Sequence, residues 1–138
     1  MYSVIRFTSD EQLLRDDIKK LGENINKLIP DSYDGFHRGG SGFSSSVSKV
    51  DNWDNHKAEI FEFLSKIESL LSDACAKNID ITLDVAIHPE DVGNSILKSY
   101  FFNRQFLKLL ATYKIELEVS LYCYGVEKEL GTEAAGSK

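Results

Sequence analysis

Cysteine is scarce in this chain. Only Cys75 and Cys123 occur in 138 residues, and they form neither a CxxC pair nor a Cys/His cluster with zinc spacing. A zinc site of the finger type is therefore not expected. A chain of this length can bury a stable core without disulfide bonds. Each cysteine lies in an apolar stretch, so we interpret both as small core residues.

Long apolar runs are also missing. No stretch approaches the ~18 consecutive apolar residues that a membrane span requires. The N-terminal sequence MYSVIRFTSDEQ has no basic region followed by a long apolar run, so it does not have the pattern of a secretory signal. These two absences lead us to expect a cytoplasmic protein.

Basic residues are outnumbered by acidic ones, 16 to 22, and the formal net charge is −6. This balance disfavours general binding to nucleic acid, which needs a basic footprint, and attraction to an anionic membrane. It favours solubility and the electrostatic steering of a basic partner. With 42% hydrophobic and 28% charged residues, the composition is that of a folded globular domain, not of a disordered chain.

Catalytic signatures are absent as well. The sequence has no GxxxxGK[ST], GxSxG or HExxH motif, and its three histidines are too far apart to indicate a metal site from spacing. We expect no catalytic residue, no cofactor and no metal. The segment 31–42 contains four of the nine glycines and is expected to be a loop. Within it, Tyr33, Asp34 and His37 are candidate contacts for a partner or a small ligand.

Hydrophobic periodicity predicts a single α+β domain over 1–125 and a flexible tail over 126–138. The predicted elements are strands at 2–8, 43–50, 79–88 and 115–124 and helices at 10–29, 56–77 and 104–114. The order β-α-β-α-β-α-β predicts a two-layer α/β sandwich, with an antiparallel or mixed four-stranded sheet and helices on one face. The serine-rich strand 43–50 has little to bury, so we expect it at an edge or poorly packed.

The two clearest strands alternate strictly between apolar and polar side chains. Ile79 to Ile87 and Ile115 to Cys123 supply the apolar face. The outward residues expected to bind a partner are Asp80, Asp84, Glu116, Glu118, Tyr122 and Tyr124. Like charges directly opposite each other on neighbouring strands are unfavourable. Either these two strands are not neighbours, or a basic strand, carrying Arg6 or Lys49, lies between them.

The only tryptophan, Trp53, lies in the turn sequence DNWDNHK ahead of a predicted helix. One interpretation is a plug that covers the end of the helical layer. The other is an energetic hot spot in a protein interface, where tryptophan is enriched. The sequence does not decide between them.

The chain resembles small bacterial α+β immunity proteins of polymorphic toxin systems, such as contact-dependent growth inhibition. The resemblance covers most of residues 2–125. It rests on the opening VIRFTSDEQLLRDDIKKLG, the turn DNWDNHK before a long helix, the strand ITLDVAIHPED and the ending NRQFLKLLATYKIELEVSLYCYG. It implies tight binding to a cognate toxin, commonly a nuclease, and it assigns no particular residue.

Three functional hypotheses follow. The first is an immunity protein that binds and neutralises a basic toxin domain by protein–protein interaction. The second is a small-molecule-binding domain or small enzyme that uses the loop 31–42. The third is a homodimeric adaptor that pairs through an exposed edge strand; the sequence leaves monomer and homodimer open.

Overall fold

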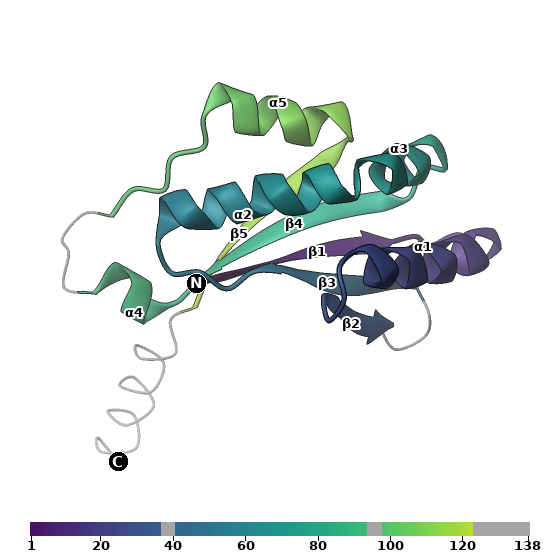
Figure 1. Cartoon of the computed structure of the whole chain (residues 1–138), viewed down its shortest axis with the longest axis horizontal. Helices are drawn as coiled ribbons and strands as arrows, with labels where there is room; N and C mark the ends of the chain where they lie inside the picture. Colours follow the sequence, from purple (N-terminus) through teal and green to yellow (C-terminus); the bar gives the residue numbers. More distant parts are fainter. Residues whose placement is uncertain (37–40, 94–97, 123–138) are drawn as a thin grey trace, which may run out of the picture.

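The computed structural model describes residues 1–36, 41–93 and 98–122. The predicted tail 126–138 lies outside these residues, as do Cys123 and Tyr124. In chain order the elements are β1 (Tyr2–Thr8), η1 (Gln12–Leu14), α1 (Arg15–Leu28), β2 (Tyr33–Phe36), β3 (Gly42–Ser48), α2 (Trp53–Lys66), α3 (Glu68–Ala76), β4 (Asp80–Ile87), α4 (Pro89–Val92), α5 (Arg104–Thr112) and β5 (Ile115–Leu121) (Figure 1). No helix in the described part of the chain is both long and apolar enough to cross a membrane.

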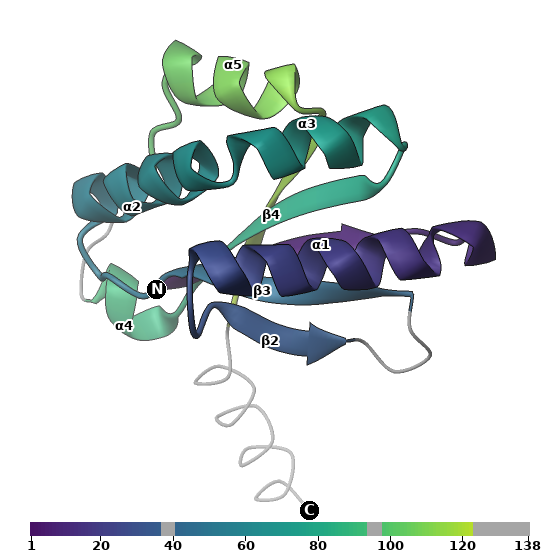
Figure 2. The same cartoon turned by 45° about the vertical axis from the view of Figure 1, so that its right-hand side comes forward.

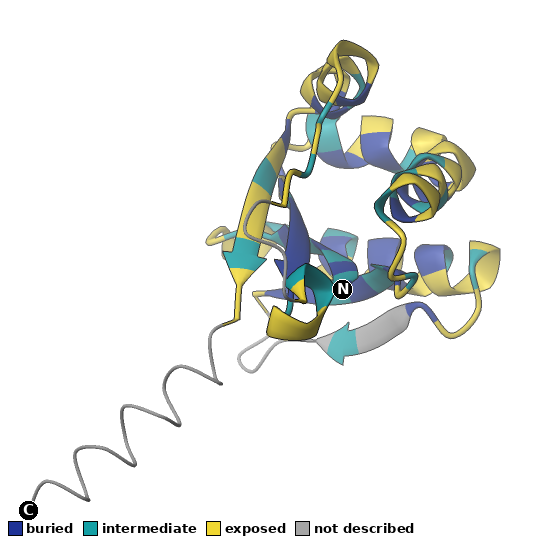
Figure 3. Ribbon diagram, turned by 90° about the vertical axis from the view of Figure 1, so that its left-hand side faces the viewer, coloured by how far each residue is buried: buried dark blue, intermediate teal, exposed yellow. Residues whose placement is uncertain are grey.

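The strands form one mixed sheet in the order β2-β3-β1-β4-β5. The pairs β2–β3, β3–β1 and β1–β4 are antiparallel, and β4–β5 is parallel. Helices α1, α2, α3 and α5 lie on one face of the sheet, and no described element covers the other (Figures 2 and 3). The predicted α+β class, with a mixed sheet and helices on one face, is confirmed.

The core lies between the sheet and the helices. It is built from the apolar side of each strand and the apolar stripe of each helix, as the periodicity predicts. Its largest fully buried side chains are Ile5, Phe7, Ile18, Ile25, Phe43, Ile60, Leu64, Ile67, Leu71, Ile81, Leu83 and Phe106. Phe7 and Phe43 stack across neighbouring strands with ring centroids 5.0 Å apart.

The sheet has five strands, not four, because β2 forms inside the segment that we expected to be a loop. The extra strand makes β3 an internal strand, so the expectation of an edge or poorly packed strand is wrong. Ser45, on the helix side of β3, is fully buried beneath the helices. A serine is small enough to let a helix lie close to the strand, and the cost is a hydroxyl that has no hydrogen-bond partner.

The predicted long helix is two helices. α2 begins at Trp53, earlier than expected, because the Asn52 side chain accepts a hydrogen bond from the Asn55 N–H and caps it. The chain leaves helical geometry at Ile67, where φ is −107°, and α3 begins at the next residue. The first predicted helix also differs at its start, since the 3-10 turn η1 precedes α1. No local sequence signal marks the break at Ile67.

Other boundaries agree with the pattern. β1 has the predicted bounds, and β4 ends just before Pro89, whose ring suits the first position of a helix. α5 begins after Asn103, the predicted cap, whose side chain accepts a hydrogen bond of 2.9 Å from the Phe106 N–H. The parallel pairing of β4 with β5 needs a crossover connection, and the chain between them, which contains α4 and α5, supplies it.

Candidate functional site

The candidate site is the face of the sheet that no described element covers. We call it the open face. Residues that alternate with the core positions of β1, β3, β4 and β5 form it. It has an acidic end on β4 and β5 and an aromatic end at the start of β1 and the close of β5. Its described members are Tyr2, Val4, Arg6, Thr8, Ser44, Ser46, Asp80, Thr82, Asp84, Ala86, His88, Glu116, Glu118, Ser120 and Tyr122.

One arginine bridges two carboxylates at the centre of the open face. β4 and β5 are direct neighbours, and their register places Asp84 opposite Glu118. Arg6, on the far side of β4, donates from Nη1 to Asp84 Oδ2 at 3.1 Å and from Nη2 to Glu118 Oε2 at 2.5 Å. The expectation that the acidic strands are separated, or have a basic strand between them, is therefore wrong. The guanidinium is long enough to reach both carboxylates across β4.

The four predicted carboxylates are not equivalent. The Asp84 side chain is only 11% exposed, and it also accepts a hydrogen bond of 2.8 Å from Ser120 Oγ. Glu118 keeps 53% of its side chain exposed. Asp80 and Glu116 are exposed, and neither forms an ion pair with any other described residue. Asp84 is thus held inside the protein's own network, whereas the other three carboxylates face solvent.

Three aromatic rings close the opposite end of the open face. His88 and Tyr122 stack with centroids 4.9 Å apart and planes at 10°, and Tyr2 lies 5.3 Å from His88. The hydroxyls of Tyr2 and Tyr122 are 3.4 Å apart. The sequence predicted Tyr122 as a contact and missed Tyr2. Its alternation with Val4 and Arg6 along β1 is the signal that could have found it.

An open hollow of about 670 Å³ joins these features. Seven of the residues that line it are polar or charged: Tyr2, Arg6, Ser44, Ser46, Lys49, Asp84 and Tyr122. Two short side chains of β3, Ser44 and Ser46, line it beside the longer tyrosine side chains. A hollow of this shape suits a side chain of a protein partner better than an enclosed small molecule.

The N-terminal ammonium takes part in a hydrogen-bond network with Asp91, next to the aromatic end of the open face. Met1 N donates to the Asp91 carboxylate at 2.9 Å, and the Asp91 side chain is 4% exposed. Asp91 also accepts a hydrogen bond of 2.7 Å from the His88 N–H. Burial opposes ionisation of Asp91, but these hydrogen bonds outweigh it and hold the pKa of the carboxyl below its ordinary value. The network positions the backbone of His88.

His56 is a structural histidine. Its ring is fully buried, with Nδ1 2.8 Å from Val50 O and Nε2 3.0 Å from Ser3 Oγ. A carbonyl can only accept, so Nδ1 carries the proton and Nε2 accepts from the serine hydroxyl. Burial is the main cause that lowers the pKa of His56. The neutral ring ties the start of α2 to β1, and every ring nitrogen is occupied.

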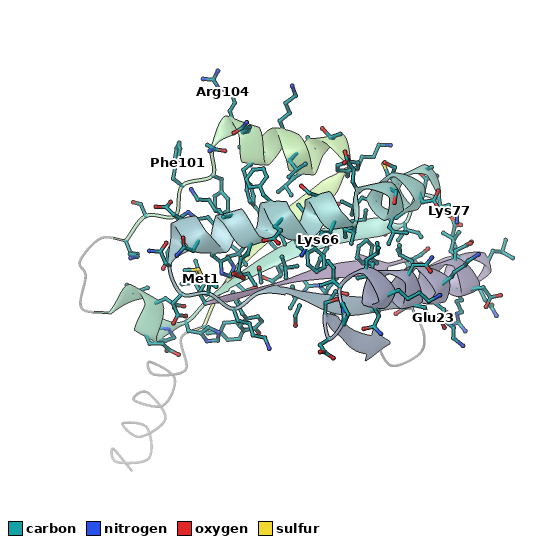
Figure 4. The ribbon with its side chains drawn as sticks, viewed as in Figure 1. Met1, Glu23, Lys66, Lys77, Phe101 and Arg104 are labelled. Carbon is teal, nitrogen blue, oxygen red and sulfur yellow. The ribbon has the colours of Figure 1, made fainter. Side chains whose placement is uncertain are left out.

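Trp53 lies in the helical layer, on α2, and not on the open face. Its ring meets Phe102 and Tyr100 edge-on at 5.1 and 5.6 Å. Its Nε1–H donates to the Phe101 carbonyl at 3.2 Å, and Lys57 Nζ lies 5.5 Å above the ring. These contacts hold the segment that leads into α5, as the plug interpretation expects. Phe101 itself points away from the fold (Figure 4).

Of the remaining predicted contacts, the two that the structure describes lie elsewhere in the fold. Tyr33 and Asp34 belong to β2, which is the opposite edge of the sheet from β5. His37 and Tyr124 lie outside the described residues, so the ligand-binding alternative for the loop 31–42 gains no support. Within the described ranges, no three His, Cys, Asp or Glu side chains group as metal ligands would. The structure therefore brings together Asp84, Glu118 and Tyr122.

Comparison with protein-family models gives no match for this chain, and comparison with curated proteins and with solved structures gives no significant match either.

Proposed function

We propose that the protein is an immunity protein that binds a basic partner, a cognate bacterial toxin domain, on the open face of its sheet. The observation that carries this proposal is the charge of that face. Of its four carboxylates, Asp84 and Glu118 share the guanidinium of Arg6, whereas Asp80 and Glu116 form no ion pair with another described residue. These four negative charges meet two positive ones, those of Arg6 and of Lys49, which lines the hollow, so the face keeps an excess of negative charge.

The open face has carboxylates that attract a basic partner and a tyrosine that can anchor it. Uncompensated carboxylates on a surface accelerate the encounter with a basic protein. The adjoining aromatic end offers Tyr122, which is 38% exposed, beside the hollow. Tyrosine is among the residues that dominate interface energies, because it buries a large ring and keeps a polar tip. A lysine or arginine of the partner can lie along the tyrosine ring and reach Glu118.

The toxin assignment is supported by the resemblance of element order and by the net charge of −6. Nuclease domains bind polyanions and are therefore basic, which makes an acidic protein face a suitable inhibitor surface. The cytoplasm, where such a toxin would act, is the location that the proposal requires.

The experiment first asks whether a gene for a toxin-like protein lies beside this gene. With the product of such a gene, it then measures association and dissociation rates at several salt concentrations. Reversal of two exposed charges, Glu116→Lys with Glu118→Lys, should lower the association rate about tenfold or more at low salt. It should also flatten the dependence of that rate on salt. The matched control is Glu23→Lys on α1, an exposed glutamate of the helical layer (Figure 4).

The control variant should associate at the wild-type rate apart from a small effect of net charge. Equal rates for the wild type and the double reversal would remove the open face as the docking surface. Failure of the wild type to protect cells that express the neighbouring protein would remove the immunity role.

A further inference from the structure

The two edges of the sheet are built differently. β2, at one edge, has four residues and a register irregularity against β3 between Tyr33 and Phe36. β5, at the other edge, has seven residues, contains no proline, and runs in unbroken register with β4 from Ile115 to Leu121. Short or irregular strands protect a sheet edge from pairing, whereas long regular ones invite it. β5 is therefore the edge that is able to accept another strand.

The backbone groups that β5 presents can be assigned. Tyr122 N–H donates to Ile87 O at 3.0 Å, so this N–H points toward β4. Backbone direction alternates along a strand, so the even positions of β5 bond to β4. The odd positions, Leu117, Val119 and Leu121, then present their N–H and C=O groups at the outer edge.

The same odd positions carry exposed apolar side chains. Val119 is 42% exposed and Leu121 is 68% exposed, although both lie on the helix side of the sheet. Leu117, closer to α5, is partly buried. An apolar stripe beside backbone groups for which the described residues supply no partner strand is the pattern of an edge that can accept another strand.

We propose that β5 pairs antiparallel with β5 of a second copy of this chain, about a two-fold axis that passes through Val119. In this register Val119 faces Val119 of the second copy, and Leu117 faces Leu121. Each of these positions exchanges both backbone hydrogen bonds with its opposite number. The apolar stripes of the two copies meet on the helix side, and the two sheets become one continuous sheet.

Charge disfavours the register one residue away. An axis through Glu118 would place the two Glu118 carboxylates directly opposite each other, which is unfavourable. The Val119 axis places Glu118 opposite Ser120 and Glu116 opposite Tyr122, so no two carboxylates face each other. Arg6 also neutralises part of the charge of Glu118 within each copy. The apolar stripe on the helix side is thus self-complementary, which favours a second copy over an unrelated strand.

The first test measures the mass of the full-length protein in solution by sedimentation equilibrium over a wide concentration range. The wild type should form a dimer. Val119→Lys sets two lysines against each other at the axis and should weaken the dimer at least about tenfold, since like charges directly opposite on paired strands are unfavourable. The matched control is Leu13→Lys at a position 92% exposed, which should leave the dimer unchanged. A wild type that stays monomeric at every concentration overturns the proposal, as does equal dimerisation of the two variants.

The second test reads the register by cross-linking, in a background with Cys75→Ser and Cys123→Ser. The two Val119 Cα atoms would lie about 5.5 Å apart, within disulfide range. The two Ser120 Cα atoms would lie roughly 8 Å apart, beyond it. Val119→Cys should therefore cross-link on oxidation, and Ser120→Cys should not. Cross-linking of Ser120→Cys as fast as Val119→Cys overturns the assigned axis. Neither test uses a toxin, so both are independent of the immunity proposal.

Discussion

At the scale of single residues, the open face depends on Arg6. It reaches Asp84 and Glu118, which are 78 and 112 residues away along the chain. The Asp84 side chain is nearly buried, and a buried carboxylate is costly unless a positive partner lies beside it. The main role of Arg6 is therefore to stabilise the folded sheet. It also lowers the net negative charge that the open face presents to a partner.

Replacement of Arg6 by methionine tests this role. The variant leaves a nearly buried carboxylate beside a second carboxylate, so we expect a loss of about 1–3 kcal/mol in the free energy of unfolding. Adding Asp84→Asn should recover much of the loss, because it removes the charge that lacks a partner. Urea unfolding at neutral pH measures both variants. If Arg6→Met alone is as stable as the wild type, the ion pairs of Arg6 contribute nothing to the free energy of unfolding.

At the scale of elements, Trp53 joins the start of α2 to the segment before α5. The ring packs against Tyr100 and Phe102, and its N–H donates to a backbone carbonyl of the same segment. This segment is the return path of the β4–β5 crossover. Its position therefore decides whether α5 can cover the apolar side of β5.

Trp53→Ala should lower the free energy of unfolding by about 2–3 kcal/mol, less than for a fully buried tryptophan, because the side chain is partly exposed. Trp53→Phe keeps the ring contacts and loses the hydrogen bond, so about 1 kcal/mol is expected. Thermal unfolding followed by circular dichroism gives the comparison. If Trp53→Ala leaves stability unchanged but weakens partner binding, the tryptophan is an interface residue instead of a plug.

At the scale of the whole molecule, stability should depend on pH through His56. Burial lowers the pKa of His56, so the folded protein resists a proton that the unfolded chain accepts below about pH 6.5. The unfolded state then binds more protons, and stability falls as pH drops. Above about pH 6.5 both states hold a neutral ring, and this contribution to stability is complete.

Urea midpoints measured from pH 7.5 down to pH 5 should therefore decrease for the wild type. His56→Gln has no group to protonate and should show a flatter profile from a lower starting stability, since it disturbs the contacts with Ser3 and Val50. His88→Gln is the control that removes the other described imidazole. A wild-type slope retained in His56→Gln would assign the effect to other groups.

Local patterns in the sequence determined much of this protein. Alternation in Asp80–Ile87 and Ile115–Leu121 identified two strands and the side of each that faces the core, because side-chain direction depends only on position along the strand. The helical stripe of α1 and the Asn103 cap of α5 are equally local signals. The α+β class followed from them.

Tertiary structure alone decided which strands are neighbours. The parallel pairing of β4 with β5, the internal place of β3 and the bridge from Arg6 depend on contacts between residues far apart in the chain, and no local pattern encodes these contacts. The physical reason is that hydrogen bonding across strands is the same for every sequence. Partners are selected by the packing of the whole core and by charges that meet only after folding. The acidic strands were visible in the sequence, but their shared arginine was not.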